Sequence, residues 1–335
     1  MNLGHRFLVL LLFFAITSWP PAAAAKDNKQ QEAEALLAKA RELSDIRCDG
    51  CPPFKLRALI RYTFPEQAPQ AGEYLLLWRN RQNWSEHINL SGFDRIRVRE
   101  GETVWRMGTS EYDPFLIDHT ALMMGRRTEL TVESSEEASK IHEHAERGMT
   151  VSCLEVRPRV GSGRRLCFDP DRGFLLRTEY SGLFSDRSVF SDYRPASGKF
   201  YPRLFTESQK GTTVATATVE EWKEASEEEL RLVVRPSGSA PEPKCDGPGS
   251  EPAKLLSHPL PPYPTSARTR GIMGKITVYA VVGRDGRLHN LTVLKSPDRE
   301  LSKAALATAE EWRYQPATCA GQPVPVVTTI DVSFQ

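Results

Sequence analysis

The stretch that decides the fold at the end of this 335-residue chain runs from residue 275 to 295 and reads KITVYAVVGRDGRLHNLTVLK. In its first half every second residue is apolar, which is the period of a β-strand with one buried face. Asp285-Gly286 suits a hairpin turn, because glycine tolerates the positive φ that such turns need. In the second half, Leu291 and Val293 would face the core. The stretch therefore predicts an antiparallel hairpin.

The residues after the hairpin complete a small α+β module. Ser296 is predicted to cap a helix, and Pro297 fits its first position, where the missing N–H costs nothing. The helix carries an apolar stripe at helical spacing: Leu301, Ala305, Thr308 and Trp312. A final strand places on one face Val326, Thr328, Ile330, Val332 and Phe334. We predict a three-stranded antiparallel sheet crossed by one helix, with Trp312 packed on the sheet and Val326–Phe334 as an edge strand.

Short motifs flank this module in a fixed order: Pro262-Tyr263-Pro264, Ala267-Arg268, Gly271-Ile272-Met273-Gly274, Ser296-Pro297 and Trp312-Arg313-Tyr314-Gln315-Pro316. With the module, residues 255–335 resemble the TonB C-terminal domain family. The resemblance implies a domain that takes up a segment near the N-terminus of an outer-membrane transporter. An unpaired edge strand can accept such a segment, and main-chain hydrogen bonds then supply the affinity.

The resemblance places partner binding on a defined set of residues: Leu260, Tyr263, Pro264, Val326, Thr328, Ile330, Val332 and Phe334. One departure concerns Leu260, since better-known members carry a glutamine three residues before the Tyr-Pro pair. The choice of partner therefore stays open. The alternative is that Val326–Phe334 is simply a solvated edge.

Residues 1–25 have the pattern of a secretory signal peptide. A basic start (Met1–Arg6) precedes an apolar run (Phe7–Ile16), and Ala22–Ala25 supplies small residues before a cleavage site near Lys26. The apolar run is shorter than the roughly 20 residues that a membrane-spanning helix needs. We expect a periplasmic protein after cleavage. The alternative is an inner-membrane protein anchored by an uncleaved N-terminus.

The rest of the chain is predicted to form two domains, residues 26–235 and 253–335, joined by a Pro-, Gly- and Ser-rich linker at 236–252. A flexible chain of this length spans roughly 25 Å on average. That is too short to bridge an envelope compartment, as a force-transducing TonB must. Docking or adaptor use of the C-terminal module is therefore at least as well supported as energy transduction.

All six cysteines follow the signal segment, an even number that suits an oxidising compartment. We predict three bridges: Cys48–Cys51, Cys153–Cys167 and Cys245–Cys319. The Cys48-x-x-Cys51 pair lacks a thioredoxin-like context, which favours a local structural bridge over a redox site. The 44 Lys and Arg residues nearly balance the 43 Asp and Glu residues, so the charge gives no sign of nucleic-acid binding.

The region from residue 26 to 235 is predicted to be rich in antiparallel strands. It opens with an amphipathic helix, Gln31–Ser44, and places two more helices at Asp113–Met124 and Ser134–Arg147. Alternating runs predict strands at 56–64, 74–78, 84–90, 96–98, 104–107, 149–157, 166–168, 173–180, 187–193, 201–207 and 213–222. A meander of this kind tends to curl into a barrel or half-barrel.

This order of elements, with Gly72–Trp78, Trp105 and Gly198–Pro202, resembles the LolA/LolB lipoprotein carriers. The resemblance implies a half-barrel with a helical lid around an apolar cavity that holds a lipid or lipoprotein. The residues expected to line it are Tyr74, Trp78, Trp84, Trp105, Phe115 and Leu116. The alternative is that these residues fill an ordinary core, which shows the same alternation.

The sequence carries no grouping typical of catalysis. His142 and His144 flank Glu143, but on the predicted helix positions two apart point to different sides, so no zinc site is expected. GxSxG and HExxH motifs and phosphate-binding glycine loops are absent from the sequence. We predict a non-enzyme without a cofactor. Its expected function is binding of an outer-membrane transporter, or alternatively transport of a lipid or lipoprotein.

Overall fold

The structure is a computed structural model that describes residues 22–63, 68–125, 130–132, 136–139, 141–146, 148–158, 163–180, 184–243, 245 and 249–335. The predicted signal segment up to residue 21, residue 64 of the first predicted strand and the turn at 161–162 lie outside this range. Within it, no helix combines the length and the apolar character that crossing a membrane requires.

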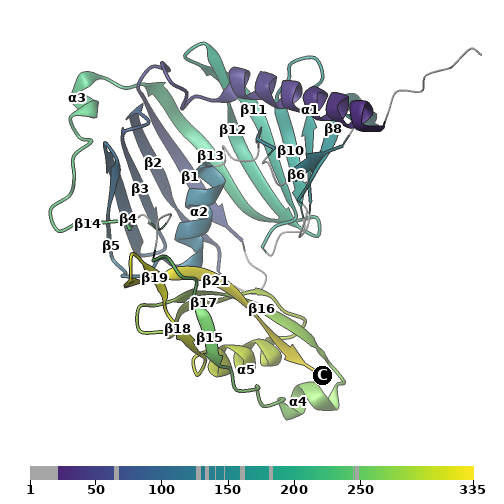
Figure 1. Cartoon of the computed structure of the whole chain (residues 1–335), viewed down its shortest axis with the longest axis vertical. Coiled ribbons are helices and arrows are strands. Elements are labelled where there is room, and N and C mark those ends of the chain that lie inside the picture. The colour runs from purple at the N-terminus through teal and green to yellow at the C-terminus, as the bar shows by residue number, and fades with distance from the viewer. Residues whose placement is uncertain are drawn as a thin grey trace, which may run out of the picture.

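Fourteen of the described strands form one curved antiparallel sheet (Figure 1). Its strands are β1 (Phe54–Tyr62), β2 (Gln70–Asn80), β3 (Asn83–Leu90), β4 (Phe93–Glu100), β5 (Thr103–Gly108), β6 (Glu136–Ala138), β7 (His142–Glu146), β8 (Met149–Pro158), β9 (Arg164–Phe168), β10 (Leu175–Tyr180), β11 (Arg187–Ala196), β12 (Lys199–Gln209), β13 (Thr212–Glu224) and β14 (Ala240–Pro241). Their spatial order is β14-β5-β4-β3-β2-β1-β13-β12-β11-β10-β9-β8-β6, and β7 also pairs with β8. The meander predicted from the alternating runs is therefore present.

The inner face of this sheet holds the main core. On β1, every second residue from Phe54 to Tyr62 is at most 1% exposed, as the alternation predicted. Helix α1 (Ala22–Ser44) packs Ala33, Leu37 and Ala40 into this core, and α2 (Phe115–Gly125) lies within the curve of the sheet (Figure 1). The first two helices were thus predicted in the right places.

The predicted helix Ser134–Arg147 is wrong. The described part of this segment forms the short strands β6 and β7, both paired with β8. Gly148, at φ +81°, turns the chain so that β7 pairs with the start of β8. Ladder hydrogen bonds thus prevail over the helix propensity of the Glu- and Ala-rich sequence. His142 and His144 therefore lie on a strand. Among the described residues, no group of His, Cys, Asp and Glu could hold a metal ion.

The C-terminal residues form a second, smaller unit below the large sheet (Figure 1). Its elements are β15 (Lys254–Ser257), α4 (Thr265–Thr269), β16 (Gly274–Val282), β17 (Leu288–Lys295), α5 (Arg299–Ala309), β18 (Arg313–Gln315), β19 (Ala317–Cys319), β20 (Gln322–Val324) and β21 (Val326–Phe334). The order β17-β16-β21 gives a three-stranded antiparallel sheet. Helix α5 and Trp312 pack on one face of it, as predicted.

The start of α5 differs from the prediction. Asp298, not Ser296, caps the helix, because its carboxylate accepts hydrogen bonds from the backbone N–H groups of Glu300 and Leu301. Burial acts to raise the pKa of Asp298, but these hydrogen bonds and the nearby Arg270 hold it below its ordinary value. A carboxylate is a stronger acceptor than the Ser296 hydroxyl, which instead donates to the Asp298 carbonyl.

All three predicted disulfides are present: Cys48–Cys51, Cys153–Cys167 and Cys245–Cys319. Cys153 and Cys167 lie directly opposite each other on β8 and β9. Cys48 and Cys51 close a turn after α1. Cys245 and Cys319 are 74 residues apart and tie the predicted linker to the C-terminal unit.

Candidate functional site

Strand β21 lies at an edge of the small sheet. It pairs with β16 along its whole length, from Val326 opposite Val282 to Phe334 opposite Gly274. No other strand in the described part of the chain pairs with its second side. The main-chain N–H and C=O groups on that side are therefore available to an added strand.

The side chains of β21 divide by face. Ile330, Val332 and Phe334 are at most 5% exposed and form the core beneath α5. Val326 is 37% exposed, and Thr328 is half-buried. Of the five β21 residues predicted to bind a partner, the three buried ones can therefore contribute only main-chain groups.

The other predicted partner residues lie before β16. The Tyr263 hydroxyl donates to the carbonyl of Ile272 (2.6 Å), and its ring packs edge-on against Phe334 at 5.7 Å. Pro264 is the N-cap residue of the short helix α4, close to the C-terminus in Figure 1. Leu260, by contrast, is 85% exposed. Tyr263 and Pro264 thus shape the end of β21, and Leu260 alone presents a large apolar surface.

Further exposed apolar side chains were missed from the sequence. Val327 on β21 is 52% exposed, and Leu255 and Leu256 on β15 are 43% and 67% exposed. The alternation on β21 placed Val327 on the solvent side of the sheet, and this placement could have indicated its exposure. Strand β15 carries no alternation, so no pattern distinguished its leucines from core residues.

The second face of the small sheet is also covered, by the large domain. Tyr279 and Val281 are buried in the core of the large domain, and Leu294 packs against it. The Tyr279 ring meets Phe115 of α2 edge-on at 5.3 Å, and its hydroxyl donates to Asp118 and to the carbonyl of Asp113. We call this contact the joint. Burial raises the pKa of the Asp118 carboxyl, an effect that the hydrogen bond from Tyr279 partly offsets.

Polar contacts surround the joint. Arg284 pairs with Glu111 (2.5 Å), and the Asn290 side-chain amide donates to the carbonyl of Tyr112 (2.6 Å). The rings of Tyr112 and His289 lie 4.5 Å apart. These contacts come from the turn and strand after β16, so the hairpin that identified the module also fixes it to the first domain.

The predicted flexible linker is fixed where the structure describes it. Strand β14 extends the large sheet beside β5, and Glu242 accepts two hydrogen bonds from Arg97 (2.8 and 2.7 Å). Arg235 stacks over the ring of Trp105 at 3.4 Å, a cation–π contact. The disulfide Cys245–Cys319 then holds the same segment to the small domain. The described residues between Arg235 and Cys245 therefore form an arm that joins the two units by structured contacts.

A cavity of about 360 Å³ lies inside the large domain, but the six predicted residues do not line it. Tyr74, Trp78 and Phe115 are core residues, and Trp84 and Leu116 pack against that core. Trp105 lies opposite Val98, on the outer face of the sheet. Trp105 does not lie on the inner face of β4 and β5 because side chains that pair with carboxylates occupy it. These are Arg95, Arg97 and Arg106.

The cavity lies between α1, α2 and strands β10–β12. Its apolar wall consists of Ile46, Met123, Met124, Leu175, Phe190 and Phe205, and its polar lining includes Arg41, Arg47, Tyr193 and Tyr201. Arg47 donates to the Met124 carbonyl (3.1 Å) and to the Tyr74 hydroxyl (3.4 Å). Burial acts to lower the pKa of Arg47, but Tyr74, Tyr201 and Glu86 more than offset this, so the guanidinium stays charged. The cavity thus suits an amphiphile with an anionic group.

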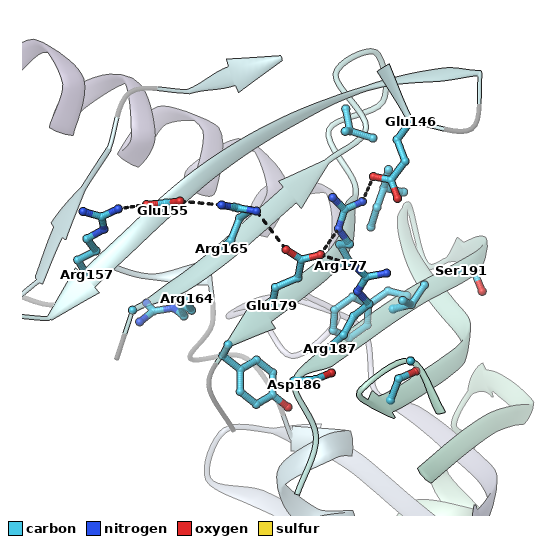
Figure 2. A pocket seen from close by; sticks show the side chains of 18 residues that line it. Glu146, Glu155, Arg157, Arg164, Arg165, Arg177, Glu179, Asp186, Arg187 and Ser191 are labelled. Carbon is cyan, nitrogen blue, oxygen red and sulfur yellow. Dashed lines mark hydrogen bonds and ion pairs between the residues drawn. The ribbon is translucent and has the colours of Figure 1, made fainter. Parts of the chain in front are cut away.

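A larger groove of about 1060 Å³ crosses the outer face of β8–β11 (Figure 2). Its charged side chains pair with one another in a chain that runs Arg157–Glu155–Arg165–Glu179–Arg177–Glu146, with Arg187 also on Glu179. Partly exposed pairs of this kind contribute little stability each. Because its charges compensate within the groove, we assign no ligand to it.

Comparison with known proteins supports the resemblance predicted for the small domain. The family model of the Gram-negative bacterial TonB protein C-terminal matches residues 259–335. Protein TonB of Pseudomonas aeruginosa is 33% identical over 72 residues, which are 21% of this chain and 21% of that protein. Protein TonB of Xanthomonas campestris pv. campestris is 31% identical over 75 residues, 22% of this chain and 34% of that protein. The chain thus spans about a third or less of these relatives' length.

Among solved structures, a LolA superfamily protein from Nitrosomonas europaea matches with a TM-score of 0.40 and 16% identity, over 58% of this chain and 94% of that chain. A lipoprotein-sorting protein domain from Vibrio parahaemolyticus matches with a TM-score of 0.37 and 14% identity, over 60% and 99%. The TonB C-terminal domain of Pseudomonas aeruginosa matches with a TM-score of 0.23 and 28% identity, over 27% and 89%. Over residues 259–335, this chain carries the TonB C-terminal domain that its sequence predicted.

Proposed function

We propose that the C-terminal domain binds an extended segment of an envelope partner, an outer-membrane transporter of TonB-linked transport, by adding it as a strand to β21. The observation that carries this proposal is the unpaired side of β21, in a sheet whose two faces are already covered. With both faces buried, this sheet can still form a ladder of hydrogen bonds at its edges, and β21 is the more regular edge strand, because two register shifts interrupt the pairing of β17 with β16. On this proposal the protein is a binding protein of the periplasm and not an enzyme.

The joint and the arm favour docking over force transmission across the envelope. The described part of the linker pairs with β5 and is bound to β19 by a disulfide. A segment held in this way cannot extend as a spacer. We therefore favour an adaptor that brings the large domain to a transporter.

Site-specific crosslinking tests the edge. A photoreactive residue in place of the exposed Thr329 of β21 should capture an outer-membrane transporter in intact envelopes. The same residue in place of Lys303, exposed on α5, is the matched control and should capture none. Equal capture from both positions, or none from Thr329, would refute strand addition at β21.

A pair of variants tests the edge in the purified protein. Val327→Asp places a charge beside the free side of β21, whereas Leu255→Asp places the same charge on β15 at similar exposure (52% and 43%). We expect Val327→Asp to weaken binding of a transporter's N-terminal peptide about tenfold, a difference of about 1.4 kcal/mol. Leu255→Asp should leave the affinity unchanged. A loss from Leu255→Asp alone would move the site to β15.

The cavity supports a second candidate function, uptake of a lipid or the acyl chain of a lipoprotein. Its volume is about 360 Å³, and its wall is mostly apolar. Small-molecule sites in proteins range from about 300 to about 1000 Å³, so the cavity is large enough to count as one. Native mass spectrometry of the full chain from envelope extracts should reveal a bound amphiphile. Phe205→Asp, which puts a carboxylate into the cavity wall, should remove it. An unliganded wild-type protein under the same conditions would count against this function.

A further inference from the structure

Helix α2 contacts both regions to which a function is proposed. Its first turn places Phe115 and Asp118 against Tyr279 of the small sheet. Its last turn places Met123 and Met124 in the wall of the cavity. The helix has 11 residues. At the usual rise of an α-helix it is therefore about 16 Å long, and it spans the distance from the joint to the cavity.

The middle of α2 is held to the sheet by buried polar contacts. The His119 ring lies 2.9 Å from the Tyr62 hydroxyl through Nδ1 and 3.1 Å from Glu207 through Nε2. Thr120 also contacts the Tyr62 hydroxyl, at 3.0 Å. Glu207 belongs to β12, the strand that places Phe205 in the cavity wall. A displacement at the cavity is therefore passed to the helix as a whole, because packed interiors transmit strain.

The walls of the cavity differ in how firmly they are held. Strands β10, β11 and β12 belong to the ladder of the large sheet. Helices α1 and α2 lie outside this ladder and are held by side-chain contacts, which for α2 include the hydrogen bonds of His119 and Thr120, and α2 is the shorter of the two (11 against 23 residues). The cavity volume of about 360 Å³ is at the small end for a ligand site. A long acyl chain therefore gains room by moving a wall, and the wall that moves at least cost is α2.

We propose that α2 couples the cavity to the joint, so that an amphiphile filling the cavity displaces Met123 and Met124 and loosens Phe115 and Asp118 from Tyr279. The small sheet is then held only by the polar contacts around the joint and by the disulfide-bonded arm, and it can shift against the large domain. This inference rests on the second function proposed above, uptake of an amphiphile. Coupling is reciprocal, so full release of the joint must strengthen binding in the cavity by the factor by which the bound amphiphile weakens the joint.

Hydrogen exchange on the full chain measures the coupling, with laurate, a single-chain carboxylate, as the probe. Saturating laurate should slow exchange in residues 187–205, beside the cavity. It should also speed exchange in residues 277–282 of β16 at least about fivefold, the lower end of usual coupling. Residues 54–62 of β1 serve as the folding control and should not change. Slowed exchange at the cavity without faster exchange in 277–282 would overturn the coupling.

Two variants separate the coupling from the uptake of laurate. Leu175→Phe fills the cavity without a ligand, and Leu176→Phe adds the same ring at a neighbouring position that lines the outer groove. The first should speed exchange in 277–282 about fivefold, and the second should not. Failure of laurate to bind would refute the cavity function, and Leu175→Phe would then decide the coupling alone. Unchanged exchange in Leu175→Phe would overturn it.

The reciprocal measurement uses Tyr279→Asp, which removes the ring from Phe115 and sets a second carboxylate against Asp118, so that the joint is released. Its affinity for laurate should rise by the factor by which laurate speeds exchange in the wild-type protein. An unchanged affinity in this variant, with laurate bound normally, would show that the joint and the cavity are independent.

Discussion

The two sheets of this protein cover their faces in different ways. The large sheet buries its inner face under its own helices α1 and α2. The small sheet buries one face under its own α5 and the other against the neighbouring domain. As a result, β16 is buried at every position from Ile276 to Val282, whereas β1 alternates. The small sheet therefore owes part of its stability to a domain that precedes it in the chain.

This difference has a functional consequence. A sheet with one solvated face can bind partners through that face or through an edge. Here the joint removes the second face, which leaves the two edges of the sheet, and of these β21 is the strand whose pairing with β16 has no register shift. The same burial makes the state of the small sheet depend on the first domain, and α2 is the helix through which that dependence acts.

Removal of the disulfide Cys245–Cys319 should have the largest effect on the difference in stability between the two domains. Its cysteines are 74 residues apart. Loop-closure entropy gives about 4 kcal/mol for a loop of this length. The variant Cys245→Ser/Cys319→Ser should lose about that much stability in the small domain, as measured by urea unfolding. Cys153→Ala/Cys167→Ala is the control: it opens a loop of 14 residues and should weaken the large domain alone. Equal losses in both domains would contradict this assignment.

Truncation beneath α5 should have the next largest effect. Leu301 is fully buried between α5 and the sheet, so Leu301→Ala should cost about 3 kcal/mol through lost burial and a cavity. Exchange should accelerate in β16, β17 and β21 and stay unchanged in β1. Leu37→Ala, at a buried position on α1, is the matched control and should produce the opposite pattern. Faster exchange in both sheets from either variant would mean that they unfold as one unit.

Much of this architecture could be predicted from the sequence. The alternation in β1, β2 and β3, the apolar stripe of α5 and the spacing of the cysteines each depend on local pattern or chain position. Strand β16 also carried a signal of its second covered face, because Tyr279 and Val281 interrupt the polar side of its alternation. That signal indicated two-sided burial but could not name what covers the second face.

The errors have a common physical cause, which is tertiary contact that opposes a local pattern. Trp105 was expected on the inner face from the resemblance to the lipoprotein carriers, but Arg95 occupies that face of the neighbouring strand. Arg95 is 5% exposed and binds Glu86 on β3 and Asp113 and Asp118 at the start of α2, two segments apart from its own strand. Nothing in the local sequence marks such a network. The cavity was misplaced for the same reason.

Removal of a single oxygen atom, that of the Tyr279 hydroxyl, should weaken the joint. Tyr279→Phe keeps the packing on Phe115 but removes a hydrogen bond to Asp118, so it should cost about 1 kcal/mol. We expect the urea midpoint of the small domain to fall while that of the large domain stays constant. Tyr263→Phe is the matched control, since its hydroxyl bonds within the small domain to Ile272. The two variants should destabilise the small domain alike, but only Tyr279→Phe should change exchange in α2.

Acidification should have the smallest effect, and it should stabilise the region around Asp118 instead of destabilising it. Burial raises the pKa of Asp118 above the ordinary value of 3.8, so the folded state binds this proton more tightly than the unfolded chain does. The charged groups that face it are Asp113, Arg95 and Arg106. The cost of burying the ionised carboxylate is present at neutral pH and disappears as the pH falls through the raised pKa. The region of α2 around Asp118 should therefore become more stable on acidification.

Slower exchange in residues 117–120 of α2 at pH 5 than at pH 7, corrected for the intrinsic rate, would reveal this stabilisation. Asp285 and Asp331 have lowered pKa values, so they oppose the trend only below about pH 4. Asp118→Asn, which carries no charge at either pH, should show no such difference. Faster exchange in these residues on acidification of the wild-type protein would mean that another group controls them, because protonation of a carboxyl with a raised pKa favours the folded state.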